Sequence, residues 1–358
     1  MSKTVFILGA GASKEGGAPV MDEFLDVARD QLALSRVDNA KEDFERVFSA
    51  ISALKVVHSN SRLDFENIET LFAACEMAKT LGRFPGSANP GADIDKLLHS
   101  LRRLIVRTLE STLRFSVTRR ANALITMEPP VPYAEFAALL RRLRDTCTPT
   151  HTIAVLTFNY DIAADFAMEL GACPPDYALD DGPAKGSKHV PLLKLHGSMS
   201  WGLAADDATR VIPLPLGKIY SESTFYSHSD GPFFWKVSEN LRLDTTTTGE
   251  PVLVPPTWNK ADSHRSLEKV WSRAAKELSE AENIFVMGYS MPETDSFFRH
   301  LYALGTVGDK TLRRFWVFNP NADLERRFRE LLGPGANRAF QFFQKTFREG
   351  IGYLHAVF

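Results

Sequence analysis

The sequence predicts an α/β fold: a Rossmann-like parallel sheet with crossover helices, a large helical insertion and a small aromatic-rich subdomain. Apolar runs with the length of buried strands recur along the chain. They cover residues 4–8, 152–156, 191–195, 283–287 and 314–318. The later runs alternate with helical patterns, at 162–170, 267–278, 296–303 and 323–332, and this alternation is typical of a parallel sheet. A chain of 358 residues has room for such a sheet and for an insertion.

Helical spacing of apolar residues follows the first strand and continues almost to the second. It is visible in 21–34, 44–57, 65–81 and 94–113, and 133–144 leads back to the sheet. A structureless loop of this length is not expected inside a compact domain. The sequence therefore predicts a helical insertion over 21–149, with a turn-rich break at 83–93 and a proline-rich end at 128–132.

The sheet domain is expected to comprise residues 1–20 and 150–335, followed by a C-terminal segment, 336–358. Within it, residues 200–260 hold many prolines and aromatic residues, among them Tyr220, Phe225, Tyr226, Phe233, Phe234, Trp235 and Trp258. Disordered segments are poor in aromatic residues. We therefore expect 200–260 to form a small folded subdomain and not a linker.

The composition is that of an ordinary globular protein, with 44% hydrophobic residues, 24% charged residues and a net charge of -2. This charge gives no overall attraction to nucleic acid or membranes, and the arginines of 102–120 are typical of a solvated helix face. No stretch approaches the ~18 apolar residues of a membrane span. Cys75, Cys147 and Cys173 are few and widely spaced, which favours a reducing cytoplasm and argues against a disulfide framework or a cysteine zinc cluster.

Three polar clusters follow the ends of predicted strands. They are the glycine loop 9–13, the segment 157–161 and the segment 194–198. Ligands of open α/β sheets bind outside the carboxyl ends of the strands, so we expect Asn159, Asp161 and His196 to meet there. Free imidazole titrates near neutral pH, which suits His196 to acid/base chemistry. The clusters predict a nucleotide site that contains an acid/base residue.

Each cluster also has a structural interpretation. Gly9 and Gly11 fit a dinucleotide-binding loop, but Lys14 stands where a third glycine is usual, so a tight strand-to-helix turn is an alternative. Asp161 can cap the helix that follows it, although one cap does not explain Asn159. His196, followed by glycine and serine, can be a turn residue.

Two further strands end in small and polar residues, and together the five strand ends resemble a known family. The segments are GAGAS (9–13), TFNYD (157–161), KLHGS (194–198), GYS (288–290) and FNPN (318–321). This set resembles the sirtuin-type NAD-binding domain. With PPTWNK (255–260) and GYSMPETD (288–295), the chain is similar to the bacterial sirtuin-like proteins of antiphage defence. The resemblance covers 1–20 and 150–335, and it leaves the helical insertion out.

The resemblance implies a role for each matching residue. It places the NAD phosphates on Gly9, Ala10, Gly11 and Ser13, the nicotinamide ribose on Asn159 and Asp161, the phosphate and adenosine side on Gly288 and Ser290, and the adenosine ribose on Asn319. His196 is the implied catalytic residue, with Asn159 and Asp161 beside it.

One departure from the family bears on the activity. Protein-deacylating sirtuins carry four cysteines that hold a structural zinc after the His-Gly motif, whereas this chain has no cysteine after Cys173. No zinc is therefore expected, and 200–260 stands where the zinc module helps to form the acyl-lysine channel. The resemblance then implies hydrolysis of NAD to nicotinamide and ADP-ribose, by an antiphage-defence effector that depletes NAD.

Two other functions share these motifs. A protein deacylase with an atypical substrate wall needs the same residues, and a non-catalytic sensor of NAD or ADP-ribose needs only the binding residues. The presence of both Asn159 and His196 argues against the sensor, because a sensor does not need a base. A free NAD hydrolase would be toxic to its cell, so we expect restraint through the helical insertion, by homo-oligomerisation or by a partner chain such as a defence-system ATPase. A passive cap is the alternative for the insertion.

Overall fold

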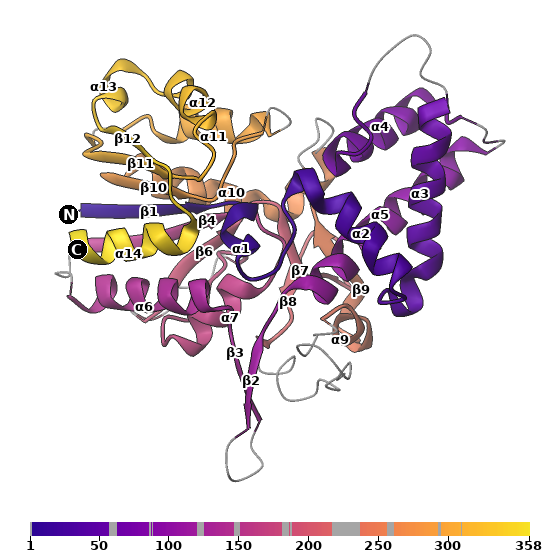
Figure 1. The fold of residues 1–358 in the computed structure, drawn as a ribbon, viewed down its shortest axis with the longest axis horizontal. Coiled ribbons are helices and arrows are strands. Elements are labelled where there is room, and N and C mark those ends of the chain that lie inside the picture. Colours follow the sequence, from indigo (N-terminus) through magenta and orange to yellow (C-terminus); the bar gives the residue numbers. More distant parts are fainter. Residues whose placement is uncertain are drawn as a thin grey trace.

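The computed structural model describes residues 2–56, 63–85, 87, 89–119, 125–146, 151–180, 186, 188–216, 237–255, 261–292, 295–308 and 310–358. Its centre is a seven-stranded sheet with the order β12-β11-β10-β1-β4-β6-β5 (Figure 1). The strands are β1 (Ser2–Leu8), β4 (His151–Thr157), β5 (Pro175–Asp176), β6 (Val190–Lys194), β10 (Asn283–Met287), β11 (Arg314–Phe318) and β12 (Phe340–Phe343). Every neighbouring pair runs parallel, which confirms the predicted fold class.

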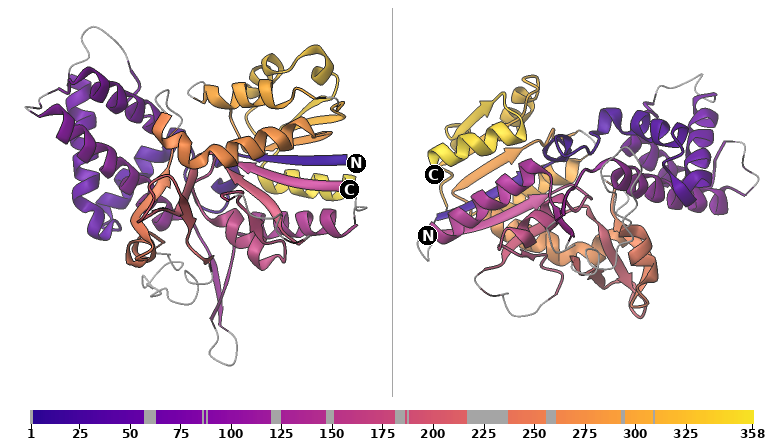
Figure 2. Two further views of the ribbon diagram at one scale, coloured as in Figure 1. Left: turned by 180° about the vertical axis from the view of Figure 1, so that it is seen from behind. Right: turned by 60° about the horizontal axis from the view of Figure 1, so that its bottom comes forward.

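Helices cover both faces of this sheet, because parallel strands need crossover connections. On one face, α6 (Val131–Thr146) packs against α7 (Ala163–Leu170) and α14 (Phe347–Val357). On the other face, α10 (Ala261–Ser279) packs against α11 (Ser296–Gly305) (Figure 2). Since both faces are covered, the central strands are mostly apolar, and all five residues of β10, including Asn283, are buried.

The order of the strands reverses beside β1. From β1 the chain continues to β4 and β6 on one side, and it later returns to β10, β11 and β12 on the other. Such a reversal is the topological switch point of an open α/β sheet, and it opens a crevice at the carboxyl ends of the strands. Here it lies between β1 and β10.

The insertion is helical, as expected. It contains η1 (Met21–Glu23), α2 (Phe24–Ala33), η2 (Asp38–Ala40), α3 (Lys41–Val56), α4 (Ile68–Leu81) and α5 (Pro90–Thr112). Buried residues of α5 recur at helical spacing, at Ile94, Leu97, Leu101 and Leu104, and α2, α3 and α4 all pack on this helix. The bundle lies beyond the carboxyl edge of the main sheet, next to the short helix α1 (Ala10–Lys14) (Figure 1).

Two small antiparallel sheets complete the described chain. β2 (Ser116–Arg119) and β3 (Ile125–Glu128) form a hairpin between the insertion and α6. β7 (Gly197–Ala204) lies between β8 (Val211–Pro213) and β9 (Thr247–Leu253), with α9 (Val237–Leu243) packed against them. Trp201 is buried in this small sheet, with its ring 5.2 Å from that of Tyr177. The other aromatic residues predicted to line this subdomain, 220–235 and Trp258, lie outside the described residues.

The C-terminal residues add to the main domain. β12 pairs with β11 and forms one edge of the sheet, after α12 (Leu324–Leu331) and α13 (Pro334–Asn337). α14 begins with a capping box, in which the Thr346 hydroxyl accepts from the Glu349 N–H and the Glu349 carboxylate accepts from the Thr346 N–H. Among the described residues, no helix is both long and apolar enough to cross a membrane.

Candidate functional site

The five predicted polar segments lie along one edge of the main sheet. The last residues of the strands are aligned, since Leu8 pairs with both Met287 and Thr157, Thr157 pairs with Lys194, and Met287 pairs with Phe318. The residues that follow these strand ends are therefore neighbours. The prediction that the clusters converge at the carboxyl edge agrees with this register.

The glycine loop packs tightly against the end of β10. The N–H of Gly9 donates to Met287 O at 3.2 Å, and the N–H of Gly11 donates to Gly288 O at 2.8 Å. Gly288 has a φ of +65°, and a Cβ there would lie 2.3 Å from the nitrogen of Ala12. Close packing therefore requires glycine in this turn. Because both loop amides already donate to β10, their use in phosphate binding requires the loop to move away from that strand.

Asn159 and Ser13 connect the loop to the end of β4. The Asn159 Nδ2 group lies 3.0 Å from Gly9 O, 3.1 Å from Ser13 Oγ and 3.3 Å from the Tyr133 hydroxyl. Ser13 Oγ donates to Asp161 Oδ2 at 2.7 Å and lies 2.8 Å from the same tyrosine oxygen. All four side chains are buried. The network joins β1, β4 and α6, and it fixes the shape of the glycine loop.

Asp161 also contacts the start of α7. Its Oδ1 accepts from the N–H of Ala163, the first residue of this helix, at 2.9 Å, although the N-cap residue is Ile162 and not Asp161 as the capping interpretation expected. Burial raises the pKa of the Asp161 carboxyl, while the charge of Lys194 and the hydrogen bond from Ser13 oppose that rise. The Lys194 ammonium donates to Asp161 O at 2.5 Å and to Asp165 Oδ2 at 2.7 Å. The buried ammonium group of Lys194 thus stabilises the backbone at Asp161.

His196 follows β6 at the same edge of the sheet. It is 5% exposed, and its Nε2 lies 3.7 Å from Asp295 Oδ1. Within the described part of the chain, this Nε2 has no hydrogen-bond partner. The other carboxylate oxygen of Asp295 accepts from the Tyr289 hydroxyl at 2.7 Å. A buried imidazole that faces an anchored carboxylate is the arrangement that general-base catalysis uses, because the carboxylate orients the ring and stabilises its protonated form.

The backbone around His196 is supported by the small sheet and by α10. His196 O accepts from the N–H of Val254 at 2.9 Å, and Leu195 O accepts from the Trp271 indole at 3.0 Å. Gly197 follows with a φ of +81°, and a Cβ there would meet the carbonyl of Val252 at 2.1 Å. The histidine is therefore placed by a chain reversal that glycine permits.

Aromatic rings lie between His196 and the glycine loop. The Phe158 ring is 5.1 Å from the imidazole and stacks on the Tyr289 ring at 4.3 Å, while Phe298 meets both rings edge to face. Tyr289 in turn touches Gly9, since a Cβ on that glycine would lie 2.5 Å from the tyrosine Cα. These contacts connect the proposed base to the proposed phosphate loop through one apolar cluster.

The remaining predicted residues follow β10 and β11. Asn319 is buried; its amide donates to Tyr289 O at 3.4 Å, and its Oδ1 accepts from the N–H of Asn321 at 3.0 Å. Ser290 is exposed, and its carbonyl accepts from Arg327 at 3.2 Å. Both residues lie at the same sheet edge as the glycine loop, on the β10 side of the switch point.

Sequence reasoning missed four residues that hold this site together: Tyr133, Asp165, Lys194 and Asp295. Asp295 and Lys194 stood within the quoted segments GYSMPETD and KLHGS, where a carboxylate and a lysine beside apolar strands were a usable signal. Tyr133 comes from the helix that closes the insertion, and nothing local indicates that it reaches Ser13. Among the described residues, no group of three or more histidine, cysteine or acidic residues could hold a metal ion.

No protein-family model matches the sequence, and no curated protein matches it. Solved structures similar to the chain include a Sir2 homologue variant in complex with ADP-ribose, at 12% identity and a TM-score of 0.42, covering 98% of this chain and 90% of that chain. A Sir2 homologue–NAD complex has 12% identity, a TM-score of 0.40 and coverages of 99% and 88%. A complex of Sir2 with a p53 peptide and NAD+ has 10% identity, a TM-score of 0.39 and coverages of 99% and 92%. The similarity to each of them is distant.

Proposed function

We propose that this protein hydrolyses NAD to nicotinamide and ADP-ribose. The observation that carries the proposal is the buried pair of His196 and Asp295, which lies at the carboxyl edge of the sheet beside the glycine loop. Open α/β sheets bind nucleotides at this edge, and the switch point lies next to the loop. In this proposal, His196 at that position faces the reacting part of the dinucleotide, with its ring packed against Phe158.

The reaction breaks the bond between C1′ of the ribose and the nicotinamide nitrogen. Nicotinamide leaves as a neutral molecule, so no acid is needed on its side, and the ribose passes through an oxocarbenium-like transition state. His196 accepts a proton from the attacking water or from a ribose hydroxyl. Asp295, whose Oδ1 lies 3.7 Å from Nε2, stabilises the positive charge that the ring acquires, which makes Asp295 a positioning residue for His196.

Asn159, Asp161 and Ser13 organise the binding side of the site. Their hydrogen bonds join the glycine loop to the end of β4 and to the start of α7. In this proposal, the nicotinamide ribose binds beside Asn159 and Asp161. In this proposal, Gly9, Ala10 and Gly11 border the phosphates, and Gly288, Ser290 and Asn319 border the adenosine side. NAD is the substrate, and the proposed reaction uses no metal.

The residues proposed to bind NAD are largely buried. Asn159 is 9% exposed, and the stacked rings of Phe158 and Tyr289 lie between the glycine loop and His196. In this proposal, these rings move when NAD binds, so an opening step precedes hydrolysis. NAD hydrolysis can be restrained at this opening step. A defence effector that depletes NAD would need such restraint.

The experiment is an incubation of the purified protein with NAD, with and without an acyl-lysine peptide, followed by chromatographic separation of the products. Hydrolysis predicts nicotinamide and ADP-ribose in equal amounts without the peptide. A deacylase predicts acylated ADP-ribose that forms only with the peptide. Binding of NAD with no product under any of these conditions, with candidate partners added, would identify a sensor and overturn the proposal.

A further inference from the structure

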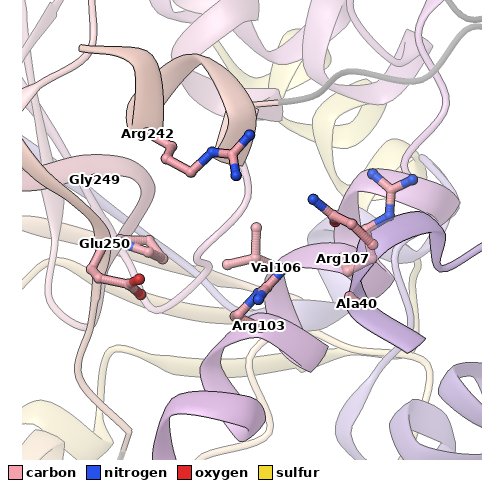
Figure 3. A pocket seen from close by; sticks show the side chains of 9 residues that line it. Ala40, Arg103, Val106, Arg107, Arg242, Gly249 and Glu250 are labelled. Carbon is pink, nitrogen blue, oxygen red and sulfur yellow. The ribbon is translucent and has the colours of Figure 1, made fainter. Parts of the chain in front are cut away.

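A pocket lies away from the candidate site, between the helical insertion and the small sheet. It encloses about 110 Å³ and is lined by Arg103 and Arg107 of α5, Arg242 of α9 and Glu250 of β9. Figure 3 shows the three arginines around the cavity and Glu250 beside it. The arginine-rich stretch 102–120 thus contributes two residues to a pocket, in addition to any solvated face.

Three guanidinium groups and one carboxylate line the pocket, and Glu250 also lies 3.5 Å from His99, outside it. Arg107 pairs with the buried Glu110 at 3.1 Å, so this guanidinium already has a carboxylate partner behind the lining. Arg103 donates to Asp43 Oδ2 at 3.1 Å, which uses part of its five N–H groups. Arg242 is exposed and, among the described residues, forms no ion pair or hydrogen bond.

The size and the donors of the pocket favour one ligand chemistry. A planar guanidinium matches the oxygens of a phosphate group and binds them with paired hydrogen bonds. One water molecule needs roughly 10–15 Å³ of cavity volume. The pocket can therefore hold several waters, or one anionic group in their place. It is well below the ~300 Å³ at which pockets begin to enclose a whole drug-sized molecule.

We infer that this pocket binds the phosphate group of a small molecule through Arg103, Arg107 and Arg242. A ligand held there joins α5 of the insertion to α9 and β9 of the small sheet. β9 also supports the candidate site, since Leu253 pairs with Gly197 and the next residue, Val254, donates to His196 O. The inference concerns binding and does not depend on the proposed hydrolysis.

The test is calorimetric titration of inorganic pyrophosphate into the full-length protein without NAD. Arg242→Gln should weaken binding by about tenfold or more, because it removes a charged hydrogen-bond donor. Glu250→Gln should strengthen binding by at least about twofold, because it removes a like charge from the lining. Arg326→Gln is the matched control, since it removes an equally charged, exposed side chain of α12 and should leave binding unchanged.

Arg242 and Arg326 are both exposed, so their variants should keep the wild-type melting temperature. Parallel titrations with ADP separate the two sources of phosphate. Tighter binding of ADP that depends on Arg242 identifies a nucleotide, and pyrophosphate binding alone identifies an inorganic ligand. No binding to the wild type, or equal binding by all four proteins, would overturn the inference.

Discussion

The pair of His196 and Asp295 supplies two roles that the proposed chemistry needs at the reacting centre: a proton acceptor and a carboxylate that stabilises its charged form. Tyr289 fixes the carboxylate from the other side through its hydroxyl. The burial of the pair increases the strength of this interaction, because the effective dielectric constant is lower there than in water. Replacing a single atom of the Asp295 carboxylate should therefore change the rate of NAD hydrolysis measurably.

Asp295→Asn should lower kcat for NAD hydrolysis by about tenfold or more, with a smaller effect on KM. The amide keeps the shape of the side chain but cannot stabilise a protonated imidazole. The loss should therefore fall on kcat, whereas a merely structural role would lower the melting temperature and impair NAD binding as well. Tyr289→Phe removes the hydroxyl that supports the carboxylate and should lower kcat by a smaller factor. An unchanged kcat in a folded Asp295→Asn protein would contradict the role of this residue.

Asp161 provides a prediction about stability. Burial raises the pKa of its carboxyl above the ordinary value of 3.8, so the ionised form opposes folding. The protonated carboxyl of Asp161 therefore contributes to the free energy of unfolding. This contribution is complete below the unfolded-state pKa and is lost as the pH rises through the folded-state pKa. The free energy of unfolding of the wild type, relative to Asp161→Asn, should thus fall as the pH rises from about 4.

Urea denaturation of both proteins over this pH range measures the difference. Asp206→Asn changes an exposed carboxylate and should show a much flatter pH dependence. If the free energy of unfolding of the wild type instead rises relative to that of Asp161→Asn as the pH increases, the prediction is wrong. The charge of Lys194 and the neighbouring hydrogen bonds would then outweigh the effect of burial on the Asp161 pKa.

At the scale of elements, the sequence predicted what depends on local pattern. β10 and β11 were predicted with their observed bounds, because both are short apolar runs between turn residues. The helices of the insertion were placed to within a few residues at most ends, with larger differences where Pro90 starts α5. The fold class followed from the alternation of these elements, and the convergence of the strand ends followed from the fold class.

What depends on distant contacts could not be predicted in this way. β5 has two residues and β12 has four, and each is a strand only because a longer neighbour pairs with it. The hairpin of β2 and β3 carries no strong alternating pattern. In the site, Tyr133 reaches Ser13 across 120 positions of sequence, and such a contact exists only after the chain has folded.

The close packing of the glycine loop on β10 also predicts a stability effect. Gly288→Ala should destabilise the protein by about 2 kcal/mol or more, because it adds a Cβ at a positive φ against the Ala12 backbone. Gly91→Ala is the control: this exposed glycine in the first turn of α5 has no atom within 4 Å of an added Cβ. It should be neutral or stabilise the helix by up to about 1 kcal/mol. Equal stability of the two variants would mean that the tight contact is absent in solution.

At the scale of the whole molecule, the helical bundle lies beyond the carboxyl edge and the small sheet connects it to the His196 loop (Figure 1). We expect the bundle to control access to the site through self-association or through a partner chain. Specific NAD turnover should then change with protein concentration, in parallel with a shift in sedimentation. A monomer whose specific activity stays constant and does not respond to candidate partners would instead support a passive cap.

The measurement that tests the central claim most directly compares wild type and His196→Ala in two assays on the same preparations. NAD binding is followed by calorimetry, and release of nicotinamide is followed by chromatography. We expect His196→Ala to keep the fold and to bind NAD, but to release nicotinamide ~100-fold or more slowly, because the variant lacks the proton acceptor. Release of nicotinamide at the wild-type rate by a folded His196→Ala protein would contradict the account.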